Sequence, residues 1–193
     1  SQTKRDMMAE VAATLAFSTI ANNDKVGVIL FSDKIEKFIP AKKGKTHVLH
    51  IIRELLSFEP TSTGTDIAQA LQYFSNAQKR HCTAFLISDF IGAGAMYKPL
   101  LIASNRHEVN AIQIYDRHGA DLPDVGLIKF HDAEAGNDLW IDTAIASVRS
   151  AYAQSWRNNQ NELEQLFTRT GVAHVSVRTD EDYVKALMHL FRC

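Results

Sequence analysis

The hydrophobic and polar positions of this chain follow two alternating periods. Residues 4–21 place apolar side chains three or four positions apart, the spacing of an amphipathic helix. Residues 26–31 (VGVILF) form a near-continuous apolar run rich in β-branched residues, which favours a strand covered on both faces. Residues 35–39 predict an antiparallel edge strand that ends at Pro40, because proline cannot donate to a strand ladder.

The alternation continues through the middle of the chain. The periodicity predicts helices over Val48–Leu56, 66–78 and 96–105, and strands over 83–87 and 109–115. Strands that alternate with helices are typical of a parallel sheet joined by right-handed crossovers. The pattern therefore predicts an α/β fold.

The pattern changes after Pro123. We expect a hairpin of strands 126–131 and 138–142, a helix over 143–169 that Gly171 ends, a strand over 172–177, and a helix over 180–191 capped by Thr179 or Asp180. We interpret residues 1–123 as an α/β core and residues 124–193 as an extension packed on the same domain.

Composition narrows the class of protein. A net charge of −1 and a pI near 6.7 give no field that attracts nucleic acid or an anionic membrane. No apolar run approaches the roughly 20 residues needed to cross a bilayer. The two cysteines, Cys82 and Cys193, indicate no disulfide framework, so we expect a reducing, cytoplasmic location. Neither has an obvious histidine partner by motif, and no Gly-x-Ser-x-Gly elbow indicates nucleophilic catalysis.

Two polar segments stand out as candidate chemistry. Asp89 is the carboxylate that ends the run Leu86-Ile87-Ser88-Asp89. Thr65 lies in a Gly-containing loop before a predicted helix. In an open α/β sheet, ligands bind beyond the carboxyl ends of the strands. A hydroxyl and a carboxylate suit Mg²⁺ or Mn²⁺. Thr65 and Asp89 are therefore the candidate metal ligands, and such a cation can recruit a carboxylate from a partner protein.

These residues carry a resemblance that runs along most of the chain. Its motifs are Thr3-Lys4-Arg5-Asp6, Asp24-Lys25-Val26-Gly27, Phe31-Ser32-Asp33, Gly64-Thr65-Asp66, Ile87-Ser88-Asp89-Phe90, Arg106-His107-Glu108-Val109 and Leu122-Pro123-Asp124-Val125-Gly126-Leu127. Together they resemble a von Willebrand factor A-like (VWA) domain, in particular the uncharacterised bacterial VWA-like proteins found alongside MoxR-type AAA+ ATPases. The resemblance implies a Rossmann-type, mostly parallel sheet with helices on both faces.

The metal site of VWA domains combines an Asp-x-Ser-x-Ser strand end, a Thr and a second Asp. By resemblance, Thr65 matches the Thr and Asp89 the second Asp, whereas the Asp-x-Ser-x-Ser element would precede Ser1. We therefore expect a fragment without its first strand, and no bound metal in this chain, although a complete protein would hold Mg²⁺ or Mn²⁺. Unpaired central edges are costly, so we also expect rearranged strand pairing or a homodimer formed through an edge.

The functional expectation is a non-enzymatic protein-interaction module that works with a MoxR-type AAA+ ATPase in chaperone-like assembly or maturation of other proteins. The alternative is a metal-dependent hydrolase that uses Asp89, Asp66 and a histidine such as His131. A third reading is nucleotide binding through Gly92-Ala93-Gly94, which lacks the third glycine of the dinucleotide motif.

Each candidate also has a simpler interpretation. Asp89 could cap a helix or a loop, and Thr65 could be only a helix N-cap. His47 and His50 have helical spacing that could place both on a metal, but no third ligand is near in sequence. The cluster from His131 to Glu134 falls at a predicted turn, where polar residues are expected in any case.

Overall fold

The computed structural model describes residues 3–62, 64–91, 95–131 and 138–191. Its first element is α1 (Lys4–Asn22), which the periodicity predicted to within one residue. Thr3 caps it by accepting a hydrogen bond from the Asp6 amide, and the Asp6 carboxylate accepts one in return from the Thr3 amide. Asn23 ends the helix in the left-handed region, with φ of 52°.

An antiparallel hairpin follows, built from β1 (Val26–Phe31) and β2 (Ile35–Lys42). The prediction that Pro40 ends the second strand is wrong, since β2 continues to Lys42. The register shifts between Val26 and Val28, opposite the proline, and an irregularity of this kind tolerates a missing donor. A Cβ on Gly27 would lie 2.7 Å from the Ile39 carbonyl oxygen, so glycine is required at this close approach.

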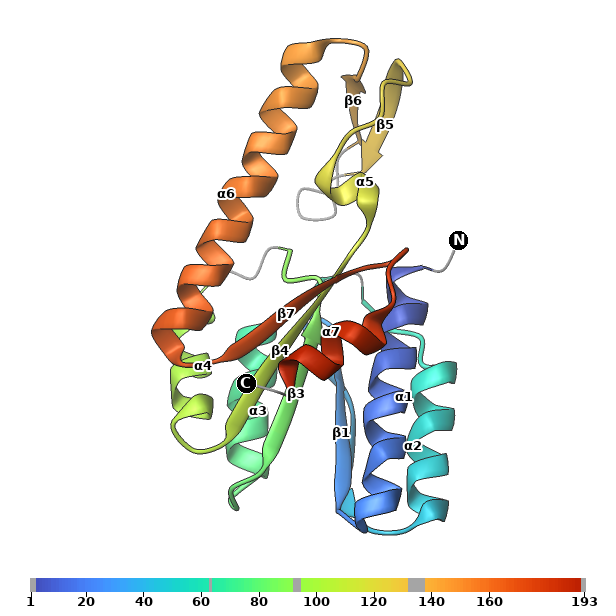
Figure 1. Cartoon of the computed structure of the whole chain (residues 1–193), viewed down its shortest axis with the longest axis vertical. Helices are drawn as coiled ribbons and strands as arrows, with labels where there is room; N and C mark the ends of the chain where they lie inside the picture. The colour runs from blue at the N-terminus through green and yellow to red at the C-terminus, as the bar shows by residue number, and fades with distance from the viewer. Residues whose placement is uncertain (1–2, 63, 92–94, 132–137, 192–193) are drawn as a thin grey trace.

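The three-stranded parallel sheet has the order β3 (Thr83–Ser88), β4 (Glu108–Tyr115), β7 (Ala173–Arg178). Helices α3 (Ile67–Ala77) and α4 (Tyr97–Ser104) pack on it, whereas α2 (Lys45–Ser57) packs with α1 on the β1–β2 hairpin. The central strand β4 is buried from Val109 to Ile114, as expected of a strand covered on both faces. The predicted α/β class with helices on both faces is confirmed (Figure 1).

Two hydrophobic cores lie on opposite faces of this sheet. One joins α1 and α7 (Tyr183–Leu190) to the sheet through Met7, Val11, Ile112, Ile114, Val177, Leu187 and Leu190. The other joins α3, α4 and α6 (Ala146–Thr170) through Ile67, Leu71, Leu86, Leu100, Ala111 and Phe167. A third core packs α1 and α2 on the hairpin, around Ala16, Ile39, Val48 and Ile51.

The hairpin and the parallel sheet are separate sheets. Within the described residues, strand β1 pairs with β2 alone and β3 with β4 alone, so each has one edge without a ladder partner there. Strand β1 has packing on both faces, since Val28 lies against the core of α1 and α2 and Phe31 against the core that contains α3, although Leu30 is the one residue of the strand that is fully buried. The pairing of β1 and β3 is not rearranged to satisfy these edges.

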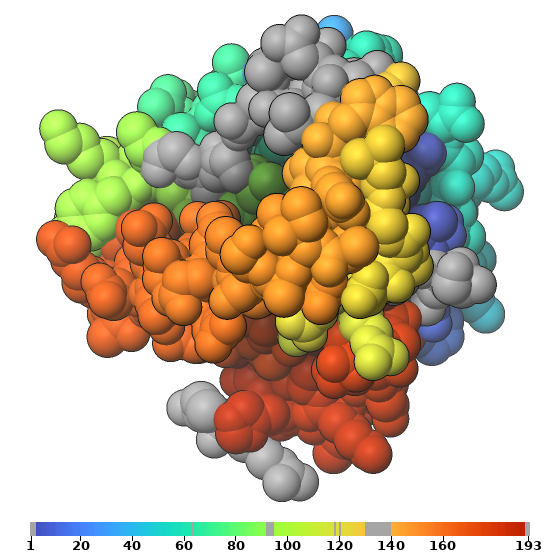
Figure 2. Space-filling model, turned by 90° about the horizontal axis from the view of Figure 1, so that it is seen from above, coloured from blue at the N-terminus to red at the C-terminus, as the bar shows by residue number. Residues whose placement is uncertain are grey.

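The last third of the chain contributes to two parts of the fold. Helix α5 (Arg117–Ala120), the antiparallel strands β5 (Leu127–His131) and β6 (Asp138–Asp142) and the start of α6 rise above the carboxyl end of the sheet (Figure 1). Seen from above, α6 and the strands β5 and β6 lie across the middle of the molecule (Figure 2). The rest of α6, β7 and α7 pack with the first half, and β7 pairs directly with β4. The boundary after residue 123 stays a prediction.

Helix ends in this part show where cap prediction worked. Gly171 ends α6 with φ of 67°, as the sequence predicted. The predicted cap at Thr179 or Asp180 is wrong: α7 starts at Tyr183, and the Asp182 carboxylate accepts the hydrogen bond from the Val184 amide. Among the described residues, no helix combines the length and apolarity needed to cross a membrane.

Candidate functional site at the strand ends

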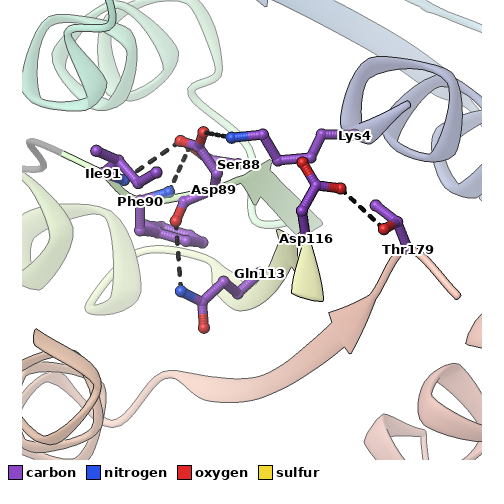
Figure 3. Close-up of polar contacts among 8 residues, drawn as sticks. All are labelled: Lys4, Ser88, Asp89, Phe90, Ile91, Gln113, Asp116 and Thr179. Atoms are coloured by element: carbon purple, nitrogen blue, oxygen red, sulfur yellow. Dashed lines mark hydrogen bonds and ion pairs between the residues drawn. The ribbon is translucent and has the colours of Figure 1, made fainter. Parts of the chain in front are cut away.

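The carboxyl end of β3 holds the first candidate residue, Asp89. One carboxylate oxygen, Oδ2, lies 2.8 Å from the Lys4 ammonium at the start of α1. The other, Oδ1, accepts a hydrogen bond of 3.2 Å from the Ile91 amide. Asp89 therefore does cap its own loop, as the simpler interpretation proposed, and it also forms an ion pair that the sequence did not predict (Figure 3).

The backbone at this strand end is held in a restricted conformation. Phe90 has φ of 55°, in the left-handed region that a bulky residue rarely occupies. Its ring is buried and packs edge to face on Phe167 of α6, with ring centroids 5.3 Å apart. The Phe90 amide donates to the Ser88 hydroxyl at 3.1 Å. Packing and hydrogen bonding together hold this turn, which fixes the direction of Asp89.

Polar side chains link the ends of all three parallel strands. Gln113 of β4 donates from Nε2 to the Asp89 carbonyl oxygen at 3.3 Å, and its Oε1 accepts from the Ser176 hydroxyl of β7 at 2.8 Å. Beyond them, the Thr179 hydroxyl donates to Asp116 at 2.8 Å (Figure 3). Gln113 is buried in an apolar strand, and sequence reasoning missed it because period alone does not reveal which buried polar group bridges two strands.

The second candidate, Thr65, is exposed on the loop before α3. This loop is tied to the carboxyl end of β1, since the Asp66 amide donates to the Ser32 carbonyl at 2.9 Å and the Ser62 hydroxyl donates to Asp33. The N-cap of α3 is Asp66, whose carboxylate accepts from the Gln69 amide at 2.8 Å. The interpretation of Thr65 as the cap itself is therefore wrong.

The two candidates lie at the same end of the molecule, because β1 and β3 run in the same direction (Figure 1). The described contacts include none between Thr65 and Asp89. Nor do three His, Cys, Asp or Glu side chains converge as a cation site anywhere in the described part of the chain. A hard cation needs about six oxygen ligands, and Lys4 already neutralises Asp89. These residues thus match only part of a metal site.

The other residues that the sequence suggested as ligands or catalytic groups do not share a site among the described residues. His47 bonds through Nε2 to the Val26 carbonyl oxygen at 2.9 Å, whereas His50 lies 3.8 Å from Glu54, so the two do not share a ligand. Residues 92–94 and 132–137 lie outside the described residues, so the glycine loop and most of the cluster that begins at His131 are not placed. Asp66, a proposed hydrolase carboxylate, acts as a helix cap.

Cys82 has a histidine neighbour in space that the motif search along the chain did not identify. The Cys82 sulfur lies 3.6 Å from Nδ1 of His107, at the opposite, amino end of the sheet. The parallel register that pairs Thr83 with Glu108 brings the two preceding residues together. The contact depends on the pairing of β3 with β4, which a motif search along the chain does not reveal.

Fold and strand-end geometry define this chain as an α/β protein with a polar layer along the carboxyl edge of a parallel sheet. A model of the family described as "protein of unknown function DUF58" matches residues 1–162, and the chain belongs to that family. An uncharacterized protein of Mycobacterium tuberculosis is 28% identical over 185 residues, which cover 94% of this chain and 57% of the relative. An uncharacterized protein of Mycobacterium avium is 27% identical over 158 residues, or 80% of this chain and 92% of that protein. The chain thus spans little more than half the length of the longer relative.

Two solved structures share the fold. A conserved hypothetical protein BatB from Bacteroides thetaiotaomicron superposes with a TM-score of 0.52 at 16% identity, over 96% of this chain and 89% of that one. An aerotolerance-related membrane protein from Bacteroides fragilis gives a TM-score of 0.53 at 18% identity, over the same shares of both chains. At these identities the comparison establishes the fold alone.

Proposed function

We propose that this protein is a non-enzymatic interaction module of the VWA-like type, and that the carboxyl edge of its sheet is the binding surface. The observation that carries the proposal is the placement of Asp89. Its carboxylate stands at a strand end on a turn fixed by Phe90 and Gln113, at the same end of the molecule as the Thr65 loop. A rigid carboxylate on a rigid sheet suits recognition of a charged group.

In the proposed complete site, Thr65 and Asp89 hold Mg²⁺ or Mn²⁺ together with an Asp-x-Ser-x-Ser strand, which this sequence does not contain. The unpaired edges of β1 and β3 support this part of the proposal, because both belong to layers covered by α1 and α3. A strand that pairs with β3 in parallel would bring its last residues to the end where Asp89 lies. The cation then binds an Asp or Glu of the partner protein.

The partner follows from the VWA resemblance. We propose a MoxR-type AAA+ ATPase, a chaperone-like role in assembly or maturation of other proteins, and a cytoplasmic location. The same unpaired edges are suited to a homodimer, because an exposed row of backbone amides and carbonyls is a template for pairing with another chain.

Binding of a purified MoxR-type ATPase to a version of the chain that carries an Asp-x-Ser-x-Ser strand before Ser1, measured by calorimetry with Mg²⁺ and again with EDTA, tests this function. We expect Mg²⁺-dependent binding that Asp89→Asn abolishes and that Asp24→Asn, a change in the exposed turn between α1 and β1, leaves within twofold. Equal binding by the wild type and Asp89→Asn would contradict the proposal. Thermal unfolding of both variants shows whether a loss of binding reflects a loss of folded protein.

The hydrolase alternative is tested on the same samples. Turnover of a panel of phosphoesters that depends on Mn²⁺ and is lost in Asp89→Asn would replace the interaction module with an enzyme. None of the described contacts joins Asp89 to Asp66, and the latter carboxylate is committed to its helix. We therefore expect no turnover above the Asp89→Asn background.

A further inference from the structure

A second cluster of ligand-type side chains lies at the amino end of the parallel sheet, opposite Asp89. It contains Cys82, which immediately precedes β3, His107, which immediately precedes β4, and His81. The β3–β4 register fixes the first two, because the Glu108 amide donates to the Cys82 carbonyl at 3.0 Å and Thr83 stands opposite Glu108. The positions of the sulfur and the imidazole thus follow from the strand ladder.

The spacing of the two fixed donors matches a shared metal ion. Typical bonds of about 2.3 Å to sulfur and about 2.0 Å to nitrogen at a tetrahedral angle place the two donor atoms about 3.5 Å apart. The observed separation between Cys82 Sγ and His107 Nδ1 is 3.6 Å. A hydrogen bond between a thiol and an imidazole has a similar length. In the metal-free protein, the thiol proton lies between the two atoms where the metal ion would lie.

The surroundings of His107 hold its ring in place beside Cys82. The side chain is 3% exposed, lies on the Phe74 ring at a centroid distance of 4.7 Å, and has its Nε2 buried without a hydrogen-bond partner of ordinary geometry. The ring is thus held in a closed setting with its Nδ1 directed at the Cys82 sulfur.

A third donor is within reach of the pair. The ring centroids of His81 and His107 lie 6.4 Å apart, and two imidazoles on one tetrahedral ion are separated by about 5 Å. His81 is exposed on the loop before β3, so its side chain has room to change rotamer. The described residues hold no group of three such side chains already placed to bind a metal ion, so the site requires His81 to move toward the pair.

We propose that Cys82, His107 and His81 form a binding site for a thiolate-seeking cation of the Zn²⁺ class, separate from the Mg²⁺-type site at the strand ends. On binding, the Cys82 S–H bond breaks, a sulfur–zinc bond forms and the proton passes to solvent. Water fills the fourth position, as it does in three-ligand zinc sites.

Calorimetric titration of the Cys193→Ser protein with Zn²⁺, in two buffers of different ionisation enthalpy, tests this site. We expect one Zn²⁺ per chain with release of about one proton. Substitution of Co²⁺ should give a thiolate-to-cobalt charge-transfer band. Cys82→Ser should remove the band and the proton release, and His81→Asn should weaken Zn²⁺ binding by roughly tenfold or more.

The matched control is His50→Asn, which removes an exposed histidine from α2 and should leave Zn²⁺ binding unchanged. Because His81 and Cys82 lie in or beside an exposed loop, their variants should keep the wild-type circular dichroism spectrum. Absence of binding, binding without proton release, or equal binding by wild type and Cys82→Ser would each overturn the site.

Discussion

At the scale of single residues, the ion pair between Lys4 and Asp89 is the contact that organises the candidate site. It links the first turn of α1 to the end of β3 at 2.8 Å, and both side chains are about one quarter to one third exposed. Solvent at this exposure weakens the attraction, so we expect a coupling free energy of about 0.5–1 kcal/mol. A double-mutant cycle of Lys4→Met and Asp89→Asn by urea unfolding measures it. Additive effects of the two changes would show that the pair contributes nothing.

The adjacent residues Thr65 and Asp66 have different roles, since Asp66 is a helix cap and Thr65 is a proposed metal ligand. Asp66 caps α3, so Asp66→Ala should lower the free energy of unfolding by about 1 kcal/mol. Thr65 is exposed and caps no helix, so Thr65→Ala should change it by less than about 0.5 kcal/mol. Chemical denaturation of the two variants side by side makes the comparison. The reverse order of effects would return Thr65 to the role of N-cap.

Residue-level prediction from sequence succeeded where a local rule applies. Asp89 was identifiable because a carboxylate ends an apolar run. Lys4 and Gln113 were not, because their roles depend on which elements pack together, and no local pattern states that Lys4 lies beside a strand end 85 residues away. The left-handed conformation of Phe90 was equally invisible, since the residue type disfavours it and packing on Phe167 imposes it.

At the scale of elements, Glu36 shows how one side chain joins a strand to a loop. Its carboxylate accepts hydrogen bonds from the Ser32 hydroxyl at 2.7 Å and from the Thr61 amide and hydroxyl, and the Ser32 bond above all lowers its pKa below 4.5. A carboxylate with a lowered folded pKa contributes stability above its unfolded pKa, and this contribution is lost as the pH falls below 4.5.

Glu36→Gln should therefore remove part of the acid dependence of stability and leave the remainder. The measurement is the urea midpoint of wild type and variant at neutral pH and at several values on the acid side of 4.5. We expect the difference between the two proteins to shrink as the pH falls. A difference that stays constant would mean that the Glu36 carboxylate has the same pKa in the folded and unfolded protein.

The positions of the helices and strands were predictable from the hydrophobic period, whereas the residues at which they end were less predictable. The 3.6-residue spacing of α1 and the apolar runs of β3 and β4 gave bounds within one or two residues. The errors lie where local rules compete with tertiary context. Strand β2 passes through Pro40 at an irregular register, and α7 begins later than expected because Asp182, not Thr179 or Asp180, supplies the cap.

At the scale of the whole molecule, the main feature is that β1 and β3 each have an unpaired edge within the described residues. The layers to which they belong are covered by the same helices, α1 and α3. Half-buried apolar residues on β1 and β3 agree with this, whereas β4, paired on both sides, is buried throughout its middle. In the monomer, at low protein concentration, hydrogen exchange should therefore be fast at alternate amides of β3 and slow along β4. Uniformly slow exchange along β3 would show that its free edge is paired in solution.

The same edges lead us to expect self-association. Size-exclusion chromatography with light scattering should give a homodimer whose fraction rises with protein concentration. A monomer at every concentration, with fast exchange at β3, would instead show that the edges stay open to solvent.

The central claim is that Thr65 and Asp89 belong to a cation site which one further strand completes. Its most direct test is Mn²⁺ and Mg²⁺ calorimetry on this chain and on a version that carries an Asp-x-Ser-x-Ser strand before Ser1. We expect no binding by the chain itself, and one cation per molecule in the extended version, lost in both Thr65→Ala and Asp89→Asn. No binding in either protein would contradict the claim, leave the similarity to VWA domains as one of fold, and remove the metal-bridged partner from the account.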